Sequence, residues 1–192
     1  RLASVGTAQS VVTVRITDKD GTPLPAGETG EIEVKGLTVM LGYWNNPKAN
    51  AETLRDGWLR TGDVGRLDAD GFLTLSDRSK DVIISGGTNI YPREVEEYLF
   101  QHPAVQLVQV FGVPDPKYGE EVCAWIVPKL GAQTSEHEIR CFARERMAHY
   151  KVPRHIRFKD ELPMTVTGKV RKVEMREKAL AILGLQQRCR GA

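Results

Sequence analysis

The stretch DRSKDVIISGGTNIYPREVEEYL, residues 77–99, separates two different patterns in this chain. It opens with a short charged segment, continues through the apolar run 82–84 and the glycine pair 86–87, and reaches Pro92. An apolar run followed by paired glycines predicts a short buried strand and a tight turn. Pro92 suits the first turn of a helix running to residue 99. The stretch therefore predicts a boundary at which a new unit begins.

Upstream of this stretch the pattern is that of β-structure. The β-branched run 11–16 and the alternating residues 30–34 each predict a strand. Asp-Gly pairs at 20–21 and 70–71 predict turns. We therefore expect residues 1–77 to form a β-rich unit.

Downstream, strands and helices are mixed. The apolar runs 105–113, 122–127 and 156–158 predict strands, and residues 172–183 predict the last helix. Another helix is expected to start at Ser135, since Glu138 completes a capping-box pattern. The side chains at helical spacing on its inner face are Ile139, Phe142, Ala143 and Met147. Residues 82–192 are thus expected to form a small α+β unit, joined to the β-rich unit by a charged linker.

Composition excludes several classes of function. The 27 Lys and Arg residues nearly balance the 25 Asp and Glu residues, so no basic surface for nucleic acid or an anionic membrane is expected. No apolar run approaches the roughly 20 residues that a transmembrane helix needs. Cys123, Cys141 and Cys189 are odd in number and far apart, which suits a reducing cytoplasm better than a disulfide-bonded secreted domain.

Lys169 is the first candidate for chemistry. It follows Gly168 in a polar loop, but a Walker-type phosphate loop would need Gly and Ser or Thr where Pro163 and Val170 stand. A lysine on such a turn can reach a phosphate as a point charge, or it can be an ordinary solvated side chain. Asp63, after Gly62, has the same two interpretations: a carboxylate that binds ribose hydroxyls, or a turn aspartate. Arg78 can bind a ribose or phosphate, or be solvated.

Metal and nucleophile sites have weaker support. His137 and Cys141 are four residues apart, a spacing that suits a shared metal ion, but His102, His149 and His155 provide no second pair. No metal site is therefore predicted. The Gly-x-Ser-x-Gly elbow of hydrolases and the Gly-x-Gly-x-x-Gly loop of dinucleotide-binding enzymes are both absent.

Four segments, taken together and in order, resemble motifs of the adenylate-forming superfamily of acyl-CoA synthetases, peptide-synthetase adenylation domains and luciferases. The segments are Gly30-Glu31-Ile32 with Gly42-Tyr43-Trp44, Trp58-Leu59-Arg60-Thr61-Gly62-Asp63, residues 77–92, and Leu162-Pro163 through Gly168-Lys169. Asn89-Ile90-Tyr91-Pro92 is most similar to AMP-forming fatty-acyl and aryl-acid CoA ligases. The resemblance implies the C-terminal portion of such an enzyme, with the end of the large AMP-binding domain (1–77), a hinge (78–81) and a small mobile domain (82–192).

The resemblance implies a reaction in two steps. A carboxylic acid attacks the α-phosphate of ATP to give an acyl-adenylate and pyrophosphate, and the thiol of CoA then attacks the adenylate and releases AMP. By this resemblance Asp63 holds the ribose hydroxyls, Arg78 assists, and Lys169 bridges the acyl carboxylate and the phosphate. ATP is the implied cofactor, with Mg²⁺ entering through ATP, and CoA is the co-substrate.

Lys80 matches the hinge position of the family. The resemblance implies that the small domain rotates there, which carries Lys169 away and brings the Gly86-Gly87 loop toward the pantetheine arm of CoA. The two lysines therefore predict different defects. Altering Lys169 should impair adenylation, whereas Lys80→Pro should impair thioester formation.

The glycine- and serine/threonine-rich phosphate loop of the family has no match in this sequence, which opens at Arg1. We therefore expect the C-terminal part of a longer, cytoplasmic ligase of fatty acid metabolism, inactive by itself. Its expected partners are a carboxylic acid, ATP, CoA and the missing N-terminal domain. Two alternatives stay open: an adenylation domain that loads a carrier protein, and a non-catalytic or split-subunit module.

Overall fold

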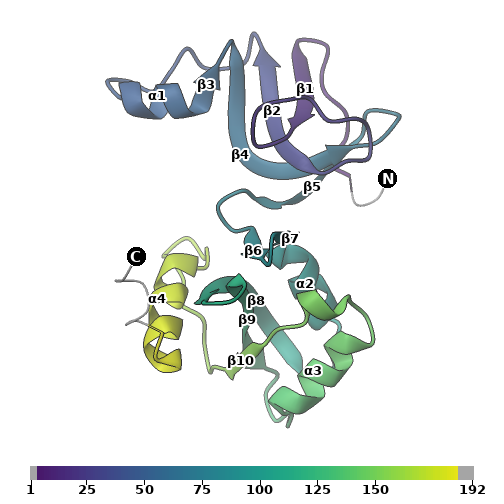
Figure 1. Cartoon of the computed structure of the whole chain (residues 1–192), viewed down its shortest axis with the longest axis vertical. Helices are drawn as coiled ribbons and strands as arrows, with labels where there is room; N and C mark the ends of the chain where they lie inside the picture. The colour runs from purple at the N-terminus through teal and green to yellow at the C-terminus, as the bar shows by residue number, and fades with distance from the viewer. Residues whose placement is uncertain (1–3, 186–192) are drawn as a thin grey trace. The chain divides into compact units, whose positions relative to one another are not determined.

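The computed structural model describes residues 4–185, and the chain divides into two compact units (Figure 1). One unit ends at Lys80 and the other begins at Asp81. The expected α+β class is confirmed, since both strands and helices are present. The charged segment expected as a linker is shorter than predicted, because Asp77 and Arg78 still belong to the last strand of the first unit.

The N-terminal unit is built around one antiparallel sheet. Its strands are β1 (Val12–Thr17), β2 (Gly30–Gly36), β3 (Leu54–Arg55), β4 (Trp58–Leu67) and β5 (Leu73–Arg78). The order is β1-β2-β4-β3, with β5 paired to β4. Ile16, Ile32 and Val64 are its buried apolar residues. Glu33 is also buried, and Arg15 compensates for the burial of its carboxylate by pairing with it at 2.6 Å.

The helix α1 (Pro47–Thr53) was not expected in the β-rich unit. Asn46 caps it by accepting a hydrogen bond from the Ala49 N–H at 3.1 Å, and Pro47 occupies the first helical position. None of its side chains is buried, so the helix leaves no apolar periodicity in the sequence. In the sequence, the Asn46-Pro47 pair was the local feature that could have predicted the start of this helix.

The C-terminal unit combines a second sheet with three α-helices. The strands are β6 (Ile83–Ser85), β7 (Thr88–Ile90), β8 (Val105–Asp115), β9 (Gly119–Pro128) and β10 (His155–Phe158). The helices are α2 (Pro92–Leu99), α3 (Glu136–Arg144) and α4 (Lys172–Leu183), with a 3₁₀ turn η1 (His149–Lys151). The order is β10-β9-β6-β7, and β8 pairs with the other side of β9. The last helix has the predicted bounds.

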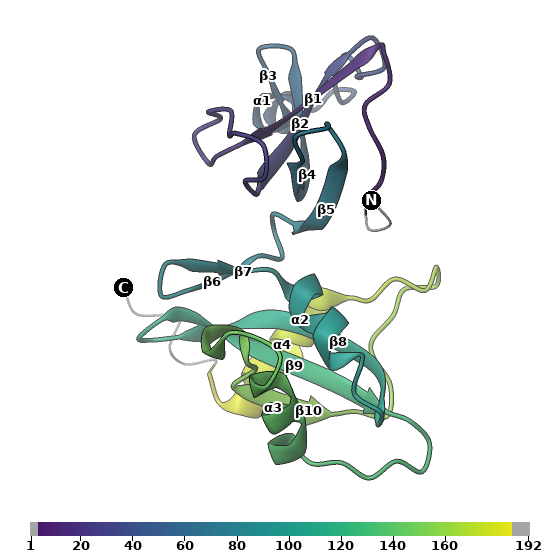
Figure 2. The ribbon, with the colours of Figure 1, turned by 90° about the vertical axis from the view of Figure 1, so that its right-hand side faces the viewer.

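Helices cover both faces of this sheet. Figures 1 and 2 show α2 and α3 on one face of β8 and β9 and α4 on the other. Val95 of α2 and Ile139 of α3 belong to one core cluster, and Met175 of α4 packs with Phe111 and Trp125 in another. Because both faces are covered, residues 122–127 of β9 are all buried, which explains their continuous apolar run. No helix in the described part of the chain is long and apolar enough to cross a bilayer.

Two local predictions need adjustment. The strand expected at 82–84 lies at Ile83–Ser85, and Ile84 is exposed although it was expected to be buried. The reason is that β6 forms a hairpin with β7, so that alternate side chains face away from the core. At the start of α3, Ser135 accepts the N–H of Glu138 as predicted, at 3.2 Å, but the Glu138 carboxylate accepts the hydroxyl of Thr134.

Candidate functional site

Asp63 and Arg78 form the first candidate group. Asp63 lies in β4 and Arg78 ends β5, and the strand register places them directly opposite each other. The Arg78 Nε lies 3.5 Å from Asp63 Oδ1. The Asp63 side chain is 39% exposed and that of Arg78 is 76% exposed, so both can still reach a ligand. The structure therefore joins two residues that the sequence proposed separately.

Asp63 does not follow a glycine turn, as the sequence had suggested, but lies in an irregular part of β4. The pairing with β2 shifts register between Glu31 and Glu33, opposite this segment. Gly62 has φ +75°, a conformation that favours glycine, and its carbonyl accepts hydrogen bonds from the backbone and hydroxyl of Ser79 at 2.9 and 3.1 Å. The Asp63 N–H donates to Thr61 Oγ1 at 3.1 Å. Such bulges redirect a side chain away from the regular ladder.

Lys80, the predicted hinge residue, is exposed, and the residues on either side of it each contact their own unit. Ser79 is bonded to Gly62 within the N-terminal unit. Asp81 lies 3.9 Å from the ammonium of Lys172 within the C-terminal unit. The boundary between the units therefore lies beside Lys80. A change of backbone angles there leaves the Ser79–Gly62 bond and the Asp81–Lys172 contact intact.

Lys169 is presented by a tight hairpin. The Thr165 carbonyl accepts the Gly168 N–H at 2.9 Å, Gly168 has φ +77°, and the Thr165 N–H donates to the Lys169 carbonyl at 2.7 Å. This is a turn followed by a left-handed glycine, a common three-residue hairpin loop. The Lys169 N–H also donates to Thr165 Oγ1 at 3.0 Å. Lys169 is exposed at this ordered tip, which suits a cation that approaches a ligand from outside the unit.

Gly86 and Gly87 form the two-residue turn between β6 and β7. Their φ values of +57° and +82° are those of a mirror-image hairpin turn, which residues with side chains seldom adopt. The Gly86 N–H donates to the Tyr118 carbonyl at 2.8 Å, which ties this turn to the β8–β9 hairpin. Asp115 in turn holds that hairpin: the backbone N–H groups of Tyr118 and Lys117 bond its carboxylate and lower its pKa.

The Gly86 turn borders a cavity of about 640 Å³ within the C-terminal unit. Arg140 and Arg144 of α3, together with Arg154, supply cationic side chains to its lining. The sequence did not single out these residues. The signal was present, because arginines four residues apart on a helix lie on one face. Arg154 precedes β10, and its place could be known only from the fold.

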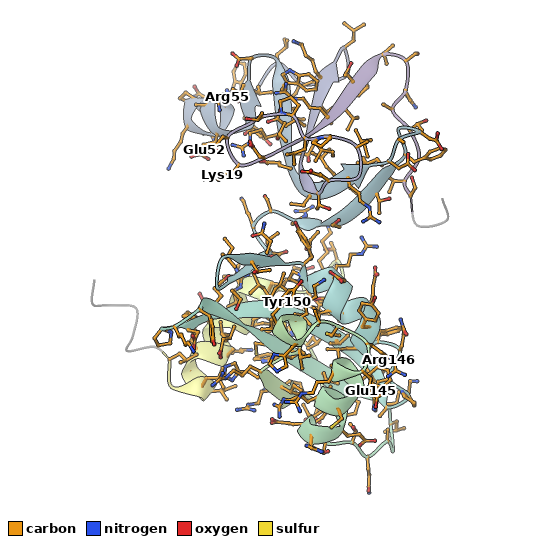
Figure 3. The ribbon with its side chains drawn as sticks, turned by 45° about the vertical axis from the view of Figure 1, so that its right-hand side comes forward. Lys19, Glu52, Arg55, Glu145, Arg146 and Tyr150 are labelled. Atoms are coloured by element: carbon orange, nitrogen blue, oxygen red, sulfur yellow. The ribbon has the colours of Figure 1, made fainter. Side chains whose placement is uncertain are left out.

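Arg144 carries the least compensated of these three charges. Arg154 pairs with the buried carboxylate of Glu121 at 3.0 Å, and Arg140 pairs with Glu136 at 3.7 Å. Among residues 4–185, Arg144 has no ion pair. By contrast Arg146, just beyond the end of α3, lies 3.1 Å from Glu145 (Figure 3). The cavity can therefore attract an anion through Arg144.

Among the described residues, no group of three or more His, Cys, Asp or Glu side chains could hold a metal ion. His137 Nε2 and Cys141 Sγ of α3 approach to 3.5 Å, but they have no further ligand beside them. Cys123 is inert for a different reason: burial raises the pKa of its thiol to about 12. Cys189 lies outside the described residues.

The family described as AMP-binding enzyme C-terminal domain matches residues 94–169. The chain is 47% identical over 178 residues to a feruloyl-CoA synthase of Amycolatopsis sp., covering 93% of this chain and 36% of that protein. It is 55% identical over 143 residues to a long-chain-fatty-acid–CoA ligase of Bacillus subtilis, covering 74% of this chain and 26% of that protein. The chain thus spans about a third or less of the length of these relatives.

Solved structures give the same result. ATP-bound MatB from Rhodopseudomonas palustris matches with a TM-score of 0.88 and 38% identity, over 94% of this chain and 36% of that chain. The o-succinylbenzoate CoA synthetase MenE of Bacillus subtilis, in complex with its acyl-adenylate intermediate, matches with a TM-score of 0.83 and 40% identity. That match covers 93% of this chain and 36% of MenE.

Proposed function

This chain belongs to the adenylate-forming enzymes, as a C-terminal portion of one, and we propose from this premise that it serves an AMP-forming acid–CoA ligase. The enzyme would activate a fatty or aryl carboxylic acid as its acyl-adenylate and transfer the acyl group to CoA. The portion described would supply ribose binding, the hinge, the adenylation lysine and part of the CoA site. The pocket for the acid and the residues that bind the triphosphate would belong to the rest of the enzyme, so the chain alone would be inactive.

Asp63 would accept the ribose hydroxyls of ATP. A carboxylate accepts two hydroxyl hydrogen bonds at once, and the guanidinium of Arg78 lies 3.5 Å from Asp63, within reach of the same ligand. The guanidinium of Arg78 is largely exposed and would also contact the nucleotide. Mg²⁺ would enter only as a companion of the ATP phosphates, since the described residues offer no ligand set of their own.

Lys169 would act in the first step. The attack of a carboxylate on the α-phosphate brings two anionic groups together and builds negative charge on the phosphate oxygens. An ammonium at the tip of a hydrogen-bonded hairpin would stabilise that charge, and it acts more strongly in a site from which water is excluded. Rotation at Lys80 would then remove Lys169 and admit the thiol.

One observation carries the CoA assignment: the Gly86 turn and Arg144 border the same cavity. CoA combines a thin pantetheine arm with a nucleotide that bears phosphate groups. A glycine turn lets a thin chain approach the backbone closely, and an arginine without an ion pair among the described residues suits a phosphate. We propose that the nucleotide end of CoA lies by Arg144 and that its arm passes Gly86 and Gly87.

The test uses the intact enzyme of which this chain is a part. A panel of fatty and aryl acids is assayed for acid-dependent exchange of pyrophosphate into ATP, and then for thioester formation with free CoA. Exchange and thioester formation together support the proposal. Exchange without transfer to free CoA would indicate an adenylation domain that loads a carrier protein, and no exchange with any acid would contradict the proposed function.

The CoA site has its own matched pair of variants. Arg144→Ala should raise the KM for CoA about tenfold to a hundredfold, because a hydrogen bond between charged groups contributes about 1.5–3 kcal/mol. Arg146→Ala removes a nearby arginine that is already paired with Glu145, and it should leave that KM near the wild-type value. Pyrophosphate exchange should be unaffected in both. Equal KM values for CoA in the two variants would refute the CoA site.

A further inference from the structure

Lys172 is a cation at the start of a helix, where its charge is unfavourable. The N-terminal end of a helix carries a partial positive charge that favours anions over lysine. Two carboxylates compensate for this: Lys172 Nζ lies 3.5 Å from Glu96 Oε1 and 3.9 Å from Asp81 Oδ2. The three side chains are only 17–24% exposed, so solvent screens this cluster less than an ordinary surface ion pair.

Glu96 connects the cluster to the sheet. Its Oε1 also accepts a hydrogen bond from the Val110 N–H of β8 at 2.8 Å. Because β8 pairs with β9 along its other side, this bond occupies part of the free edge of β8. Helices α2 and α4 lie on opposite faces of the sheet (Figure 2). The Lys172–Glu96 contact therefore joins the two helices around that edge.

The same lysine connects two functional segments of the C-terminal unit. Lys172 follows Lys169 by three residues. The hairpin that carries Lys169 ends directly before Lys172, where the Arg171 N–H donates to the Pro163 carbonyl at 2.9 Å. Asp81 is the first residue after Lys80. One ammonium group thus lies between the base of the Lys169 hairpin and the residue at which the unit begins.

We propose that Lys172 is a positioning residue, which fixes the Lys169 hairpin to the start of the C-terminal unit so that both move as one body. This inference rests on the proposed function, in which rotation beside Lys80 delivers and withdraws Lys169. Without the Lys172 contacts, the hairpin would lose its link to Asp81 and so to the residue beside the hinge. Lys169 would then reach the adenylation geometry less often, whereas the Gly86 turn would be unaffected.

The variants are Lys172→Met, Lys172→Arg and the control Lys178→Met, all in the intact enzyme. Lys178 is also on α4, but it forms an exposed pair with Glu174 at 2.8 Å. Amide hydrogen exchange over residues 163–171 should become about tenfold faster in Lys172→Met, because local opening becomes more frequent. Acid-dependent pyrophosphate exchange should fall about tenfold, while thioester formation from preformed acyl-adenylate is retained.

Lys172→Arg should restore both measurements, because a guanidinium can contact two carboxylates. Unchanged hydrogen exchange in Lys172→Met relative to Lys178→Met would overturn the inference. So would faster exchange throughout the unit with equal loss of both half-reactions, because Lys172 would then serve general stability. If the wild-type enzyme adenylates no acid, the proposed function fails, while hydrogen exchange still decides whether Lys172 holds the hairpin.

Discussion

Arg78 lies opposite Asp63 across the β4–β5 strand pair, with its Nε 3.5 Å from Asp63 Oδ1. In the sequence, the rest of β4, a turn at 68–71 and most of β5 separate the two residues, and strand register alone makes them neighbours. This arrangement leaves the Asp63 carboxylate partly exposed beside a guanidinium. The residue pair thus offers an acceptor for hydroxyl groups and a donor for a phosphate at one edge of the N-terminal unit.

Asp63→Asn in the intact enzyme should raise the KM for ATP by about tenfold to a hundredfold, because hydrogen bonds to a charged acceptor are replaced by weaker neutral ones. Steady-state kinetics with ATP as the varied substrate measures this. Glu52→Gln, which neutralises an exposed carboxylate on α1, is the control and should have no effect (Figure 3). An unchanged KM for ATP in Asp63→Asn would remove Asp63 from the ribose site.

Lys169→Ala should lower the rate of adenylation by about 10²–10³, by analogy with the loss of one donor that stabilises transition-state charge. Acid-dependent pyrophosphate exchange measures this step. Thioester formation from preformed acyl-adenylate should be nearly unchanged, since Lys169 would have left the site by then. Lys129→Ala, at another exposed lysine of the same unit, serves as the control. Equal loss in both half-reactions would contradict the assigned role.

Lys80→Pro should have the converse effect, with thioester formation impaired and adenylation retained. Proline restricts the backbone φ angle at the position where rotation is proposed. Lys80→Ala is the control, because it removes the same side chain and leaves the backbone free. Single-turnover assays of the two half-reactions separate these outcomes. A similar defect in Lys80→Ala would show that the side chain, rather than the backbone, is what matters.

Cys123 should resist alkylation in the folded protein at about pH 8, while Cys141 is modified. Burial raises the pKa of the Cys123 thiol from 9.0 to about 12, whereas Cys141 is only partly buried. Mass spectrometry of peptides after iodoacetamide treatment distinguishes the two sites. Modification of Cys123 at the rate of Cys141 would show that the β9 core opens readily.

The same shift predicts a pH dependence of stability. The folded-state pKa lies above the unfolded-state value, so the neutral thiol's contribution is complete below pH 9 and is lost as the pH rises toward about 12. The free energy of unfolding should therefore fall between about pH 8 and about pH 10.5 more steeply in wild type than in Cys123→Ala. Urea denaturation at both pH values measures the difference.

Local signals in the sequence were sufficient for most elements. Pro92 and Ser135 mark the starts of α2 and α3 where the structure has them, since helix-initiating chemistry acts within one turn. The continuous apolar run of β9 was recognisable because both faces of that strand are covered. The helix α1 was missed because it buries nothing, so that apolar periodicity had no reason to arise.

The sequence by itself determined the α+β class, the order of the motifs and the candidacy of Asp63, Arg78, Lys80 and Lys169, because each depends on residues close together in the chain. Only the tertiary structure decided which of them meet. The register of β4 against β5 pairs Asp63 with Arg78, and the covering of β8 by helices from both faces brings Lys172 to Glu96 and Asp81. The cavity beside the Gly86 turn and Arg144 is likewise lined by residues that lie between 85 and 154 in the sequence. Such contacts follow from strand pairing and helix packing over long sequence separations, which local composition does not specify.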